Sequence, residues 1–137
     1  MSSICLSFDE VHEQAAKLDI RVSVTGFMSV IDLLGDVDKY TCPRLRQTIL
    51  DLLGDGIRQI VVSLENVEYI DSTGLGSLVS GMMSVSRQNG QFAVFGANPR
   101  IRKALEITGL SRLIPVFDSE SAALDSFAFE EALALAA

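Results

Sequence analysis

The chain has 137 residues, of which 48% are apolar and 21% charged, a composition typical of one globular domain rather than a disordered segment. Its formal net charge is −7 and its basic residues are scattered, which argues against nucleic acid or a membrane surface as a direct partner. Two cysteines, Cys5 and Cys42, are too few for a disulfide framework, and the N-terminal segment lacks the basic start of a signal peptide, so we expect a cytoplasmic protein.

The first 18 residues are expected to stand apart from the rest of the chain. Ser7 and Glu10 have the spacing of a capping box, which marks the start of a helix. Apolar residues at helical spacing surround them: Phe8, Val11, Ala15 and Leu18. We therefore predict an N-terminal arm or short helix over residues 1–18 and a folded domain over residues 19–137.

A hairpin is predicted next. Residues 20–24 alternate between apolar and polar side chains, the pattern of a half-buried strand. A Thr25-Gly26 break separates them from a second apolar segment at residues 28–34, so the two segments are expected to pair. After the hairpin, Thr41 and Pro43 open a predicted helix that ends at the glycines 54–56.

The middle of the chain alternates between strand and helix patterns. Residues 60–64 are a nearly continuous apolar run, typical of a strand that is covered on both faces. A helix is predicted from the turn at residues 71–76 to about residue 87, with Ser77 on its polar face. Residues 91–95 then form another buried strand pattern.

Three more elements complete the predicted order. Asn98 and Pro99 are expected to start a helix that runs to about Thr108. Residues 113–117 are predicted as a last strand, which Pro115 places at the edge of the sheet. A final helix is expected to open at Ser119 and to contain the apolar residues Ala122, Leu124, Phe127 and, if it extends that far, Leu133.

This order of elements predicts the fold class. Strands that alternate with helices of about three turns form an α/β sandwich with parallel strands at the centre. The opening hairpin adds an antiparallel pair. We therefore expect a single α/β domain with a mixed, mainly parallel sheet of about five strands and about four helices.

The turn Asp71-Ser72-Thr73-Gly74-Leu75-Gly76 is the most informative segment for function. It places a hydroxyl where a strand becomes a helix, and the free N–H groups at a helix start favour an anion. Ser72 there can cap the helix, act as a nucleophile or accept a phosphate. A purely structural role remains open, in which Asp71 or Ser72 is the cap and Gly74 and Gly76 allow close packing.

Catalysis finds little support in the residues. The glycine-rich turn lacks the lysine and spacing of a phosphate-binding loop, and His12 is the single histidine available as a base for Ser72. One histidine and two distant cysteines do not make a metal site. We therefore expect that the protein is not an enzyme and has no catalytic residue, cofactor or metal. The alternatives are a small nucleotide-binding α/β protein and an enzyme that uses Ser72 as nucleophile.

Three segments together resemble a known family. Residues 67–76, Val-Glu-Tyr-Ile-Asp-Ser-Thr-Gly-Leu-Gly, are similar to the signature of the anti-sigma factor antagonists, which belong to the STAS domain family. Leu34-Gly35-Asp36-Val37-Asp38 and the segment from Asn98 to Leu110 resemble the second and third markers of that family. The resemblance extends over about residues 20–127.

The resemblance implies a function and a set of residues. In that family the serine after the aspartate is phosphorylated by a partner that is both an anti-sigma factor and a serine kinase, and this position is Ser72. Asp38 matches an acidic position that contacts the kinase. The partner surface is then expected to comprise Asp38, Asp71, Thr73, Gly74 and Leu75.

The implied function is a partner switch that regulates sigma-factor-dependent transcription. The unphosphorylated chain would bind the kinase, phosphorylation would release it, and a serine phosphatase would reset it. A STAS scaffold or transporter-accessory binding module is the alternative within the same family.

Overall fold

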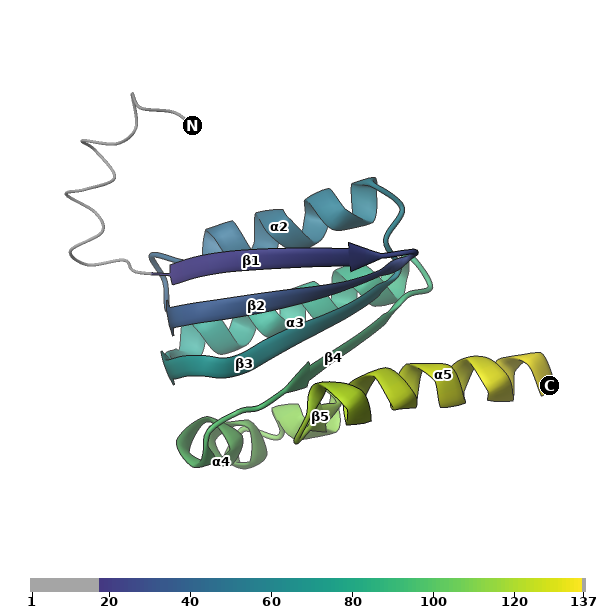
Figure 1. The fold of residues 1–137 in the computed structure, drawn as a ribbon. Coiled ribbons are helices and arrows are strands. Elements are labelled where there is room, and N and C mark those ends of the chain that lie inside the picture. Colours follow the sequence, from purple (N-terminus) through teal and green to yellow (C-terminus); the bar gives the residue numbers. More distant parts are fainter. Residues whose placement is uncertain (1–17, 137) are drawn as a thin grey trace, which may run out of the picture.

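The computed structural model of the chain describes residues 18–136 and shows a five-stranded sheet between two layers of helices (Figure 1). The strands lie in the sheet in their order along the chain: β1 (Leu18–Thr25), β2 (Met28–Val37), β3 (Gln59–Ile70), β4 (Gln91–Phe95) and β5 (Val116–Phe117). β1 and β2 are antiparallel, and each later pair is parallel. The expected hairpin and the mixed, mainly parallel sheet are thus confirmed.

Helices α2 (Cys42–Gly54) and α3 (Ser72–Arg87) cover one face of the sheet, and α5 (Glu120–Ala136) covers part of the other (Figure 1). Side chains alternate along β3 between the two layers: Ile60, Val62 and Leu64 join the core under α2 and α3, whereas Val61 packs with Phe127 of α5. β3 is therefore covered on both faces, as its apolar run predicts.

Two strand boundaries differ from the prediction. β3 continues through Ile70, six residues beyond the apolar run, because its second half follows β2 through two register shifts. The strand expected at 113–117 is reduced to Val116–Phe117. A short 3₁₀ helix, η1 (Leu110–Arg112), precedes it, and the Ile114 N–H donates to the Leu110 carbonyl instead of to a strand.

Two side chains also lie elsewhere than their patterns predict. Ser77 is buried and donates its hydroxyl to the Gly74 carbonyl oxygen at 2.6 Å, so it does not belong to the solvent face of α3. Leu133 of α5 is 54% exposed, whereas Ala123 is fully buried beside Phe127. The helical spacing identified the element correctly and its buried face only in part.

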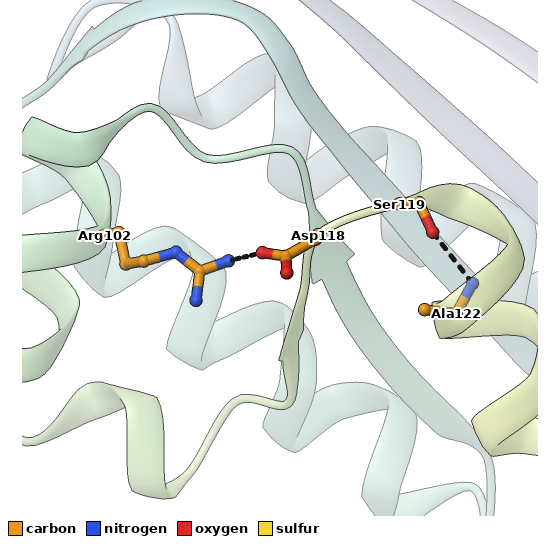
Figure 2. Close-up of polar contacts among 4 residues, drawn as sticks. All are labelled: Arg102, Asp118, Ser119 and Ala122. Atoms are coloured by element: carbon orange, nitrogen blue, oxygen red, sulfur yellow. Dashed lines mark hydrogen bonds and ion pairs between the residues drawn. The ribbon is translucent and has the colours of Figure 1, made fainter.

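The start of α4 (Pro99–Ile107) is fixed as expected by Asn98, whose side chain accepts from the Ile101 N–H at 2.8 Å. Figure 2 shows the junction between β5 and α5: Asp118 pairs with Arg102 of α4 at 2.6 Å, and the Ser119 hydroxyl accepts from the Ala122 N–H at 3.2 Å. Ser119 therefore begins α5, as predicted.

The arm or short helix expected over residues 1–18 lies almost wholly outside the described residues, and only Leu18, the first residue of β1, can be placed. Within residues 18–136, the structure contains no helix of the length and apolar character that crossing a membrane requires.

Candidate functional site

The ends of β2 and β3 bring the segments that carry Asp38 and Asp71 together. These neighbouring parallel strands both end on the same edge of the sheet, where Val37 lies opposite Ile70. The chain then leaves β2 through the loop 38–41 and leaves β3 through Asp71 into α3. The two exits are joined by a hydrogen bond in which the Asp71 N–H donates to the Val37 carbonyl oxygen at 3.2 Å.

Asp71 is the residue that caps α3. Its carboxylate oxygen Oδ1 accepts from the Gly74 N–H at 2.7 Å, and its carbonyl oxygen accepts from the Leu75 N–H at 2.9 Å. This settles the alternative that the sequence left open between Asp71 and Ser72 as cap. The Ser72 hydroxyl is not needed to begin the helix.

Ser72 and Thr73 occupy the first two positions of α3, and both are exposed. The N–H groups at this end carry the positive end of the helix dipole. Both hydroxyl groups are therefore accessible at a site that favours negative charge.

The loop that carries Asp38 is held by its own side chains. The Asp38 Oδ1 accepts from the Tyr40 N–H at 2.9 Å and from the Thr41 N–H at 3.1 Å. Thr41, only 1% exposed, donates its hydroxyl to the Asp36 carbonyl oxygen at 2.8 Å and accepts from the Asp38 N–H at 3.0 Å. These four bonds fix residues 36–41 as one compact turn.

A further contact joins this loop to α3. The Lys39 N–H donates to Oδ2 of Asp71 at 3.3 Å, across 32 positions of sequence. Both oxygens of the Asp71 carboxylate thus accept N–H groups, one from α3 and one from the loop. Asp38 and Ser72 are therefore carried by segments that Asp71 connects.

Gly74 and Leu75 lie beneath the surface rather than on it. Leu75 is 8% exposed and belongs to the core under α3. A Cβ placed on Gly74 would lie 2.3 Å from the Val37 carbonyl oxygen, while one placed on Gly76 would meet nothing within 4 Å. Of the two glycines, Gly74 alone is required for the close approach of α3 to β2.

The charge of this edge is mostly negative. Asp36 is exposed, and Asp38 and Asp71 are half-buried around the start of α3. Lys39 provides a cation beside them, and its Nζ lies 5.1 Å from the centre of the Tyr40 ring. Residues 18–136 contain no group of three or more histidine, cysteine or carboxylate side chains arranged to hold a metal ion.

Sequence patterns alone did not identify three contributors to this site. Thr41 is the N-cap residue of α2, as expected, but its hydroxyl makes no capping bond and braces the loop. The Lys39 contact joins residues far apart in the chain. Asn98 caps α4 as predicted and also places its amide nitrogen 3.3 Å from the Val67 and Glu68 carbonyl oxygens of β3. The Lys39 and Asn98 contacts depend on tertiary structure, which a local pattern does not encode, whereas the Thr41 bonds are local to residues 36–41.

Comparison with known protein families identifies the family of this chain. The family model described as STAS domain matches residues 17–123, and the chain belongs to this family.

Its relatives include anti-sigma factor antagonists. An anti-sigma-B factor antagonist of Staphylococcus aureus is 40% identical over 99 residues, which cover 72% of this chain and 92% of that protein. The crystal structure of an anti-sigma factor antagonist from Mycobacterium paratuberculosis superposes with a TM-score of 0.73 at 27% identity, covering 81% of this chain and 94% of that one. The Bacillus cell fate determinant SpoIIAA in its phosphorylated form shares the fold, with a TM-score of 0.62 at 23% identity over 80% of this chain and 98% of that one.

Proposed function

We propose that this chain is an anti-sigma factor antagonist whose unphosphorylated form binds an anti-sigma factor that is also a serine kinase. Phosphorylation of Ser72 releases the partner, and a serine phosphatase restores the binding form. The protein acts in the cytoplasm as a regulatory binding protein of transcription and not as an enzyme. The observation that carries this proposal is the exposed Ser72 hydroxyl at the first position of α3, with capping performed by Asp71.

The site can accept a phosphate without disturbing the fold. Within the described structure, the Asp71 and Gly74 N–H groups have partners in Val37 and in the Asp71 side chain. The N–H groups of Ser72 and Thr73 are then the donors that a phosphate on Ser72 would meet. Anions at a helix start are stabilised by these donors and by the dipole, so modification should cost little stability.

The same phosphate would oppose partner binding. It adds about −1.5 to −2 charges at pH 7 beside Asp38 and Asp71. Placing like charges together across an interface costs several kcal/mol, which lowers affinity by orders of magnitude. Because the change is local, the switch needs no rearrangement of the sheet.

Relatives support the choice of partner. The Staphylococcus aureus relative, 40% identical over most of its length, carries the name anti-sigma-B factor antagonist. Asp38 and Asp71 flank Ser72 in the present chain, as the signature of that family leads one to expect. The name of this relative supports an anti-sigma factor as the partner, and the kinase activity proposed for the partner comes from the family resemblance. ATP and its metal ion would belong to that partner.

Affinity capture with two variants tests the proposal. Ser72→Ala and Ser72→Asp proteins are immobilised and exposed to lysate of the source organism, and captured proteins are identified by mass spectrometry. We expect an anti-sigma factor with a kinase domain to be retained by Ser72→Ala and lost from Ser72→Asp. The captured kinase and ATP should then phosphorylate the wild-type chain at Ser72, with Thr73→Ala as the matched control.

The result that contradicts the proposal is equally definite. Equal capture by both Ser72 variants, or phosphate that maps to another residue, would remove Ser72 as the switch. Stabilisation of the protein by a nucleotide alone, seen as a rise in melting temperature, would favour the nucleotide-binding alternative instead.

A further inference from the structure

Besides the Leu75 N–H on its carbonyl oxygen, Asp71 makes three hydrogen bonds, and two of them reach outside α3. Its Oδ1 accepts from the Gly74 N–H at 2.7 Å, its Oδ2 accepts from the Lys39 N–H at 3.3 Å, and its own N–H donates to the Val37 carbonyl oxygen at 3.2 Å. A simple helix cap requires the first of these bonds alone. The other two reach to the end of β2 and the loop after it.

We propose that Asp71 is a positioning residue, which holds the loop 38–41 against the start of α3 and so sets Asp38 relative to Ser72. This inference rests on the proposed function for its effect on the partner, but its structural part concerns the chain alone. It differs from the role that the family resemblance implies, in which Asp71 belongs to the surface that the partner contacts.

The burial and bonding of Asp71 support a positioning role. The residue is half-buried, and both carboxylate oxygens already accept N–H groups from the chain. A carboxylate that is bound in this way has reduced capacity to accept donors from a partner. In Asp38, by contrast, one oxygen alone, Oδ1, receives the bonds from the Tyr40 and Thr41 N–H groups at 2.9 and 3.1 Å. The Oδ2 of Asp38 takes no part in these loop bonds.

Hydrogen bonds within the loop keep Lys39 and Asp38 in a fixed relative position. Thr41, buried in the turn, bonds to Asp36 and Asp38 through its hydroxyl, and the Asp38 carboxylate bonds back to Tyr40 and Thr41. Because these bonds make the turn one unit, a single contact from Asp71 to Lys39 orients the whole turn. Loss of that contact should therefore misplace Asp38 without unfolding α3.

The substitution Asp71→Asn distinguishes the bond from the Gly74 N–H from the bond from the Lys39 N–H. The amide oxygen of asparagine can still accept from the Gly74 N–H, but its amide nitrogen donates and cannot accept from the Lys39 N–H. Asp71→Asn should therefore keep the helix cap and lose the loop contact, whereas Asp71→Ala should lose both. Asp38→Asn is the matched control, since its Oδ1 still accepts within the turn while the charge disappears.

The first measurement needs no partner. Amide hydrogen exchange and amide chemical shifts are followed by NMR in the wild-type chain and in Asp71→Asn. We expect the Lys39 amide to exchange about tenfold faster in the variant, as one lost hydrogen bond to a charged group implies, with the Gly74 amide little changed. An unaltered Lys39 amide would overturn the proposal.

The second measurement is a double-mutant cycle with the kinase that Ser72→Ala captures. For phosphorylation of Ser72 we expect Asp71→Asn to raise KM about tenfold and to leave kcat within about twofold, because docking is disturbed and the acceptor is not. If Asp71 acts through Asp38, adding Asp71→Asn to Asp38→Asn should raise KM no further.

Multiplying effects in the double variant would mean that Asp71 contacts the partner independently, and would overturn the proposal. If the kinase does not modify even the wild-type chain at Ser72, the proposed function fails. In that case the NMR measurement still decides whether Asp71 positions the loop.

Discussion

Gly74 of α3 lies so close to Val37 of β2 that a Cβ on the glycine would stand 2.3 Å from the Val37 carbonyl oxygen and 2.8 Å from Cγ2 of Ile70. The same carbonyl oxygen accepts the Asp71 N–H at 3.2 Å. The start of α3 is thereby held against the end of β2 by backbone atoms, which have little freedom to move aside. Ser72, which lies between Asp71 and Gly74, thus belongs to a helix start that backbone contacts hold against β2.

Gly74→Ala should therefore destabilise the protein by about 1–3 kcal/mol, the usual cost of forcing an extra group into a packed site. Urea unfolding measures the change. Gly76→Ala is the control, because a Cβ there meets nothing within 4 Å and alanine is favoured over glycine in a helix by about 0.5–1 kcal/mol. Equal stability of the two variants would contradict the role given to Gly74.

Replacement of Ser72 by a charged residue should affect partner binding strongly and stability little. Ser72→Glu places a negative charge at the exposed start of α3, so we expect the free energy of unfolding to stay within about 1 kcal/mol of the wild type. Binding of the anti-sigma factor, measured by calorimetry, should be lost. A variant that unfolds readily, or that binds normally, would conflict with the proposed switch.

Thr41→Val tests the internal bracing of the loop. Valine has the shape of threonine but leaves the Asp36 carbonyl oxygen and the Asp38 N–H without the hydroxyl that now bonds to both. At a residue that is 1% exposed, this should cost about 1–3 kcal/mol in urea unfolding.

Thr48→Val is the matched control for that experiment. Its hydroxyl donates to the Arg44 carbonyl oxygen at 2.8 Å on the surface of α2, where water can replace it. We expect a change below about 0.5 kcal/mol. A larger loss at Thr48 than at Thr41 would show that the hydroxyl at 41 does not brace the turn.

Asn98 should contribute more to stability than a helix cap alone. It accepts from the Ile101 N–H at 2.8 Å and places its amide nitrogen 3.3 Å from the Val67 and Glu68 carbonyl oxygens. Asn98→Ser keeps a cap but loses the contacts to β3, and Asn98→Ala loses both. Thermal unfolding should rank the wild type above the serine variant and the serine variant above alanine, with a total loss of about 2 kcal/mol.

Much of the fold could be predicted from local chemistry. The alternation of residues 20–24, the continuous apolar run at 60–64 and the Asn98-Pro99 start each depend on neighbouring residues, and the structure confirms all three elements. The strand predicted at 113–117 was mostly wrong because the N–H groups of Leu113 and Ile114 both donate to the Leu110 carbonyl oxygen in the turn that follows η1. An apolar segment this short does not distinguish a strand from a buried turn.

The position of Ser72 at the start of a helix could be predicted from the sequence, but the contacts that hold the neighbouring loop could not. A hydroxyl after aspartate at a strand-to-helix change located Ser72 and its cap. That Lys39 bonds to Asp71 depends on the pairing of β2 with β3, which brings residues 32 positions apart into contact. A local sequence pattern does not predict a contact between residues so far apart in the chain.

The way in which the loop 38–41 is held has a consequence for selectivity among partners. Asp71 holds Lys39, and Asp38 holds Tyr40, through main-chain N–H groups, so neither bond depends on which side chain stands at 39 or 40. Both side chains are exposed, Tyr40 at 55%. Their identity can therefore change while the scaffold around Ser72 stays in place. Any residue other than proline at these two exposed positions keeps both main-chain bonds, so the surface beside Ser72 can vary while the loop stays anchored.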